Sequence, residues 1–79
     1  MTETNRNNGA RFRILSALAS EGMLTLDELA QHARLTPAQV RDNANAAVPE
    51  KLLTKTKDEV THSLAYKITP EGRQWLSAR

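Results

Sequence analysis

The 79-residue sequence contains no cysteine, few aromatic residues and no long apolar run. The absence of cysteine excludes a disulfide-bonded scaffold, a thiolate metal site and a cysteine nucleophile. No apolar segment approaches the roughly 20 residues that a membrane-spanning helix requires. The polar start, MTETNRNNG, lacks the apolar core of a signal peptide. We therefore expect a soluble, cytoplasmic protein with no membrane partner.

Residues that would carry catalysis or bind metal are also scarce. Neither His32 nor His62 has an acidic residue or a cysteine at the spacing of a metal-binding cluster. The adjacent acids Asp27 and Glu28 are better explained as the start of a helix. The sequence has no glycine-rich phosphate loop. We expect no enzyme activity, no cofactor, no metal and no small-molecule ligand.

The charge balance is mildly basic, with 11 Lys and Arg against nine Asp and Glu, a net charge of +2. A nucleic-acid-binding protein with so small an excess must gather its positive side chains on one face. An ordinary soluble surface has the same composition, so charge alone does not decide between these functions. The length indicates one domain with a small core.

The first part of the chain predicts a tail and two helices. Residues 1–8 are polar and predict a disordered tail, which leaves residues 9–79 as the single folded domain. Apolar residues at helical spacing follow up to Gly22, which ends the first helix; they are Phe12, Leu15, Leu18 and Ala19. Thr25 and Glu28 form the capping box of a second helix.

A third helix is predicted over residues 36–48. Thr36 is its cap, Pro37 occupies the first helical position, and Gln39 completes a second capping box. Three small apolar residues recur at helical spacing and should face the core; they are Val40, Ala44 and Ala47. The helix should end before Pro49, which lacks an amide donor.

Beyond Leu52 the pattern changes to alternation. Leu64, Tyr66 and Ile68 alternate with polar or small residues, which predicts a half-buried strand. Residues 52–69 therefore form a hairpin, with its tip around residues 57–59. Thr69 and Pro70 begin a last helix, whose apolar residues are Trp75 and Leu76.

The order of these motifs resembles a known family. LTLDELA, then LTPAQV, then the pair Leu52–Leu53 and the segment YKITPEG follow one another as in the winged helix-turn-helix domains of bacterial regulators of the MarR, ArsR and PadR kinds. The resemblance covers residues 10–76. It implies an α+β fold: a single winged helix-turn-helix domain with a three-helix core, a two-stranded wing and a short C-terminal helix.

The resemblance also implies which residues would contact DNA. In a helix-turn-helix the second helix enters the major groove, where amides can bond adenine and arginine can bond guanine. The expected base contacts on helix 36–48 are Gln39, Arg41, Asn43 and Asn45. The expected phosphate contacts surround that helix and lie on the wing; they are Arg34, Thr36, Lys55, Lys57 and Lys67. The alternative is a solvated helix, with the lysines serving only solubility.

Two questions remain open in the sequence. Trp75 and Leu76 fit either of two roles, closing the core or forming the surface of a homodimer.

The function expected is sequence-specific binding of double-stranded DNA by a small transcriptional regulator, a repressor or an accessory factor. The alternative is a winged helix that docks onto another protein without binding DNA. DNA binding predicts basic side chains on one face, whereas docking predicts an exposed apolar patch.

Overall fold

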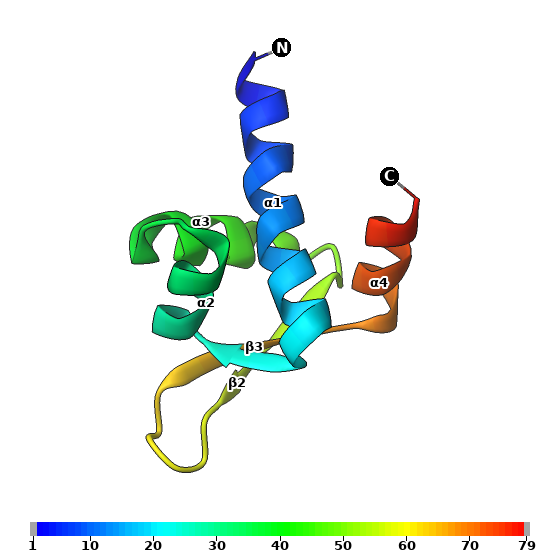
Figure 1. Ribbon diagram of the computed structural model, residues 1–79. Coiled ribbons are helices and arrows are strands. Elements are labelled where there is room, and N and C mark those ends of the chain that lie inside the picture. Colours follow the sequence, from blue (N-terminus) through cyan, green and yellow to red (C-terminus); the bar gives the residue numbers. More distant parts are fainter. Residues whose placement is uncertain (1, 79) are drawn as a thin grey trace.

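The structure, a computed structural model, describes the backbone of residues 2–78 (Figure 1). The element order within these residues is the predicted one: helix, short strand, two helices, two strands and a final helix. The elements are α1 (Thr2–Glu21), β1 (Met23–Thr25), α2 (Leu26–Ala33), α3 (Pro37–Ala47), β2 (Leu53–Lys57), β3 (Leu64–Ile68) and α4 (Pro70–Ser77).

The first helix is longer than the sequence predicts. Residues 1–8 were expected to form a disordered tail, but α1 begins at Thr2. Helical hydrogen bonds are local, so a helix can extend through polar residues that have no core to face. Its N-terminal half projects beyond the other elements (Figure 1). The helix ends as predicted, because Gly22 takes a φ of 89° and its N–H donates to the Leu18 carbonyl.

Both capping boxes of the helix-turn-helix are present. The hydroxyl of Thr25 accepts from the N–H of Glu28, whose carboxylate in turn accepts from the N–H of Thr25. The same reciprocal pair joins Thr36 and Gln39 at the start of α3. Between the helices, Arg34 adopts a left-handed φ of 60°, which reverses the chain within the three residues 34–36. Local side-chain chemistry thus fixes where both helices begin.

The three strands form one antiparallel sheet in the order β1-β3-β2. Leu24 of β1 and Lys55 of β2 lie opposite Tyr66 on either side of β3. The wing loop covers residues 58–63, which is longer than the tip predicted at 57–59. Asp58 explains the longer loop. Its carboxylate accepts hydrogen bonds from the N–H groups of Val60 and Thr61, so these groups bond within the loop and not to a strand.

The core lies between the three helices α1, α2 and α3 and one face of the sheet. Its fully buried large side chains are Ile14, Leu15, Leu18, Leu29, Val40, Leu53 and Tyr66. Ala44 and Ala47 are buried beside Val40, as the spacing predicts. Phe12 differs from its prediction as a core residue, since 41% of it is exposed.

The last helix closes the domain against α1. Trp75 and Leu76 are partly buried and pack against the core, which is the first of the two roles that the sequence left open. The guanidinium of Arg11 lies 5.9 Å from the centre of the Trp75 ring. Within the part of the chain that the structure describes, no helix is long and apolar enough to cross a membrane.

Candidate nucleic-acid interface

The outward side of α3 is polar and exposed, as the sequence predicts. Arg41 and Asn45 are exposed, and Asn43 is half-buried at the edge of the core. Val40, Ala44 and Ala47 hold the opposite side of the helix in the core. The helix therefore presents a row of amide and charged groups to solvent.

Two of these amides also bond their own helix. The Gln39 side-chain oxygen accepts from the N–H of Thr36 at 2.9 Å, which is the capping interaction. The Asn43 amide nitrogen donates to the Gln39 carbonyl oxygen at 2.8 Å, a bond to the preceding turn. Contact with a base edge through these same atoms would first require the two bonds to break. Asn45 makes no side-chain hydrogen bond within the described residues.

Arg41 is held only weakly. Its Nε lies 3.9 Å from a carboxylate oxygen of Asp42, and the two side chains are 56% and 76% exposed. An exposed pair at this distance contributes about 0–1 kcal/mol. Solvent contact and a weak partner leave the guanidinium able to turn toward a ligand.

The strand register separates the lysines that the sequence grouped together. Lys55 lies opposite Tyr66, and Lys57 lies opposite Leu64, so both occupy the face of the sheet that the helices cover. Side chains alternate along a strand, so Lys67 points to the other face. We name these the helix face and the outer face. Lys55 and Lys57 can share a ligand with α3, whereas Lys67 is directed away from it.

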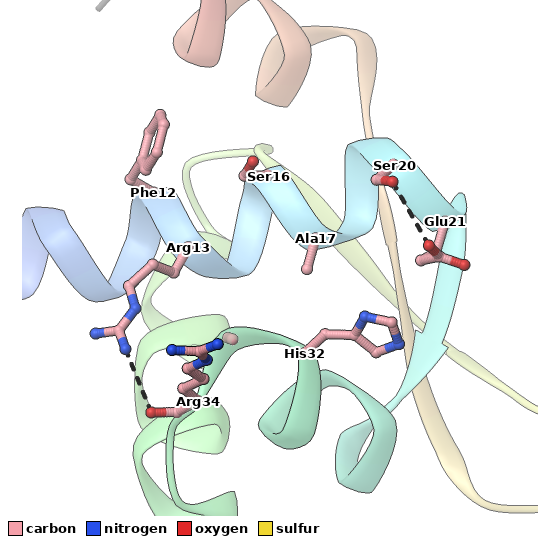
Figure 2. Close-up of a pocket in the computed structure, with 9 residues that line it drawn as sticks. Phe12, Arg13, Ser16, Ala17, Ser20, Glu21, His32 and Arg34 are labelled. Atoms are coloured by element: carbon pink, nitrogen blue, oxygen red, sulfur yellow. Dashed lines mark hydrogen bonds between the residues drawn. The ribbon is translucent and has the colours of Figure 1, made fainter.

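Arg34 borders a cleft between α1 and α2. The cleft has a volume of about 340 Å³ and includes Phe12, Arg13 and His32 among its lining residues (Figure 2). The guanidinium of Arg13 donates to the Arg34 carbonyl at 3.4 Å. Arg34 therefore takes part in the contact of α2 with α1, and Thr36 is already committed to its cap. Within residues 9–78, whose side chains the structure describes, no group of acidic residues and histidines is arranged to bind a metal ion.

The hydroxyl of Tyr66 is a polar atom in the core that the sequence analysis did not single out. Tyr66 is completely buried, and its hydroxyl has no hydrogen-bond partner among the described residues. Burial raises the pKa of the Tyr66 phenol, while the nearby positive charge of Arg41 acts to lower it. The sequence did indicate this position, because the alternation along residues 64–68 places the Tyr66 side chain, which ends in a polar atom, on the buried face.

The wing tip is acidic and ordered by its own side chains. Hydrogen bonds from the backbone N–H groups of Thr61 and Val60 hold the pKa of Asp58 below its ordinary value. The carboxylate is therefore charged at neutral pH. Glu59 adds a second negative charge at the same place. The basic side chains of the wing lie on β2 and not at its tip.

Solved structures of transcriptional regulators share this arrangement. A MarR family transcriptional regulator from Silicibacter pomeroyi superposes with a TM-score of 0.82 at 21% identity, over 89% of this chain and 47% of that one. The fold is a winged helix-turn-helix. The transcriptional regulator BldR from Sulfolobus solfataricus gives a TM-score of 0.80 at 26% identity, over 87% and 50% of the two chains. BpsR of Bordetella bronchiseptica gives 0.79 at 26% identity, over 87% and 50%.

These comparisons confirm the predicted α+β fold class with its three-helix core, two-stranded wing and short C-terminal helix. The similarity is to winged helices of the MarR kind, and the ArsR and PadR kinds are not confirmed. The winged helix chain spans about half the length of the three solved structures. No protein-family model matches the sequence, and neither does any curated protein sequence.

Proposed function

We propose that this winged helix binds double-stranded DNA as the DNA-binding part of a transcriptional regulator. The observation that carries the proposal is the exposed polar side of α3, with Arg41 on it and Lys55 and Lys57 on the helix face of the adjoining strand. A helix fits the major groove, and lysines beside it can contact the phosphates. BpsR, whose solved structure is similar to this chain, is a protein whose DNA binding is regulated.

The proposed roles of the predicted residues differ from one another. Arg41 and Asn45 can contact bases without first breaking a hydrogen bond to the backbone of α3. Gln39 and Asn43 are base contacts only after their amides leave the helix. Lys55 and Lys57 contact phosphates from the wing, and the remaining predicted phosphate contacts carry less of the interaction; they are Arg34, Thr36 and Lys67.

We further propose regulation by occupancy of the DNA site, as a repressor or an accessory factor. A homodimer would supply two half-sites and raise affinity. Trp75 and Leu76 contribute to such a dimer only through their exposed portions, since both pack against the core. The mass of the free protein in solution, measured by analytical ultracentrifugation, tests the dimer: 8.8 kDa indicates a monomer.

The exposed apolar side chains give little support to the protein-docking alternative. The large ones within the described residues are Phe12, Met23, Val60 and Leu64. Met23 lies opposite Lys67 on the outer face, and Leu64 lies opposite Lys57 on the helix face. Phe12 is on α1, and Val60 is on the wing loop. The four residues thus do not share one face, whereas a docking patch requires a contiguous apolar surface.

Fluorescence anisotropy with a labelled random-sequence duplex tests the proposal. We expect binding at low salt, with the logarithm of the association constant falling linearly with the logarithm of salt concentration at a slope of about 0.9 per phosphate contacted. A labelled single strand of equal length is the control for nonspecific adhesion. Absence of binding to the duplex at low salt would refute the proposal and favour a protein partner.

A further inference from the structure

Three groups that bind phosphate well lie on neighbouring elements: Tyr66 on β3, Lys55 opposite it on β2, and Arg41 on α3, whose positive charge acts on the Tyr66 phenol. Tyr66 reaches from β3 into the core, and its hydroxyl has no partner among the residues that the structure describes. Lys55 is its neighbour across the β2–β3 ladder and lies on the same face of the sheet. Arg41 follows Val40, which is buried in the same cluster as Tyr66. The three side chains come from three different elements.

An unpartnered phenol at this position is costly. A buried hydroxyl without a hydrogen bond destabilises a fold by about 1–3 kcal/mol. A core built only for stability would carry phenylalanine, which packs the same ring without the polar atom. Arg41 gains little from Asp42 at 3.9 Å and is free to move. The retained hydroxyl and the loosely held guanidinium therefore favour an occupant that bonds both.

We propose that Tyr66, Arg41 and Lys55 form a subsite for one phosphate group between α3 and the wing. The Tyr66 O–H donates to a phosphate oxygen, while Arg41 and Lys55 supply positive charge, so that Arg41 contacts the DNA backbone in place of a base. Because the Tyr66 hydroxyl is buried in the free protein, the phosphate reaches it only after the side chains over it move, and Arg41 turns away from Asp42 in the same step. The inference rests on the proposed function for the source of that phosphate, which is the DNA backbone beside the groove that α3 occupies.

The charges around the subsite agree with this occupant. Lys57 lies two residues beyond Lys55 on the same face and extends the positive surface along β2. The negative group nearest along the chain is Asp42, whose side chain is 76% exposed and is therefore screened by solvent. The acidic wing tip at Asp58 and Glu59 lies at the far end of the hairpin. A phosphate at the base of the wing therefore meets more positive charge than one at its tip.

The test compares wild type with Tyr66→Phe in two assays. In the first, duplex binding is measured by anisotropy at low salt. Tyr66→Phe leaves the net charge unchanged, and we expect its affinity to fall about tenfold, which is about 1.4 kcal/mol for one lost hydrogen bond to a charged group. Lys55→Gln should lose more affinity than Lys67→Gln, which removes the same charge from the outer face.

In the second assay, the melting temperature is measured in sodium phosphate and in sodium chloride of equal ionic strength. Wild type should melt higher in phosphate, because a ligand that binds only the folded state stabilises it. Tyr66→Phe should show a smaller difference, because only the general stabilising effect of phosphate on folded proteins is left. It should also melt at least as high as wild type in chloride, because it removes an unpartnered polar atom.

The two assays separate the two proposals. A smaller phosphate effect in Tyr66→Phe than in wild type, without duplex binding by wild type, would support the subsite and refute the DNA-binding function. Duplex binding that is equal in wild type and Tyr66→Phe would overturn the subsite and leave the function standing. A Tyr66→Phe protein that melts lower in chloride and responds to phosphate like wild type would show an internally satisfied hydroxyl, which also overturns the subsite.

Discussion

Arg11 and Glu50 form a two-pronged ion pair that joins α1 to the turn after α3. The Arg11 Nη1 donates to the Glu50 Oε1 at 3.0 Å, and its Nη2 donates to Oε2 at 2.8 Å. The same guanidinium lies against the Trp75 ring of α4. One arginine on α1 thus contacts both the end of the helix-turn-helix and the last helix, so its loss should loosen two contacts at once.

The pair makes stability depend on pH in the acid range. Hydrogen bonding to Arg11 lowers the pKa of Glu50 below its ordinary value of 4.5. A lowered pKa adds stability above the unfolded value, and that stability is lost as the pH falls through the folded value. We expect Glu50→Gln to melt lower than wild type at pH 7, with the difference disappearing toward pH 3.

Thermal unfolding followed by circular dichroism between pH 3 and 8 measures this. Glu59→Gln is the matched control, because Glu59 on the wing loop forms no ion pair in the part of the chain that the structure describes. Curves for wild type and Glu50→Gln that stay equally far apart from pH 8 to pH 3 would contradict the role of the ion pair.

Replacing Lys51 with glycine should stabilise the folded protein. Its φ of 64° lies in the left-handed region, which costs a residue with a side chain about 1–2 kcal/mol. Lys51→Gly should therefore unfold at higher urea concentration than Lys51→Ala, which removes the same charge and keeps the strain. Equal midpoints for the two variants would contradict this explanation. The turn matters for function because it sets the start of the wing.

Two glycines should respond oppositely to alanine. A side-chain carbon at Gly72 would overlap the Leu52 carbonyl oxygen and lie 2.7 Å from Cγ1 of Ile68. Gly72→Ala should therefore destabilise the fold by about 1–3 kcal/mol. The space around Gly9 in α1 is open, so Gly9→Ala should stabilise it by up to about 1 kcal/mol. Urea unfolding measures both effects. An unchanged midpoint for Gly72→Ala would refute the close packing of α4 on Leu52, the residue before β2.

The single tyrosine allows its ionisation to be measured directly. Absorbance of the phenolate reports Tyr66 alone, because the chain has one tyrosine. Burial raises the pKa of Tyr66, so its titration midpoint should lie above 10 in the folded protein. The folded state then holds the proton longer than the unfolded state, so this group makes stability fall as the pH rises above about 10. A midpoint at or below 10 would contradict the buried hydroxyl.

The elements that the sequence predicted well are those fixed by neighbouring residues. The starts of α2 and α3 depend on Thr25 and Thr36 with the residues three positions later, and both were predicted. The burial of Val40, Ala44 and Ala47 follows from helical spacing alone. The polar side of α3 was predicted for the same reason.

Contacts between distant segments were not predictable in this way. The faces of Lys55 and Lys67 depend on how β2 pairs with β3, and a shift of one residue reverses every side chain of a strand. The pair of Arg11 and Glu50 spans 39 positions. The local bond from the Asn43 amide to the Gln39 carbonyl was not predictable either, because it depends on the Asn43 rotamer, which competes with base contact at the same residue.

Duplex binding by wild type, Arg41→Ala and Arg73→Ala tests the central proposal most directly. Both variants remove one arginine; Arg41 lies on α3, whereas Arg73 lies on α4, on the other side of α1 (Figure 1). If α3 faces the groove, Arg41→Ala should weaken binding about tenfold, because a DNA contact of α3 is lost, and Arg73→Ala should bind like wild type. Equal losses in the two variants would show that only net charge matters, and that α3 does not enter the groove.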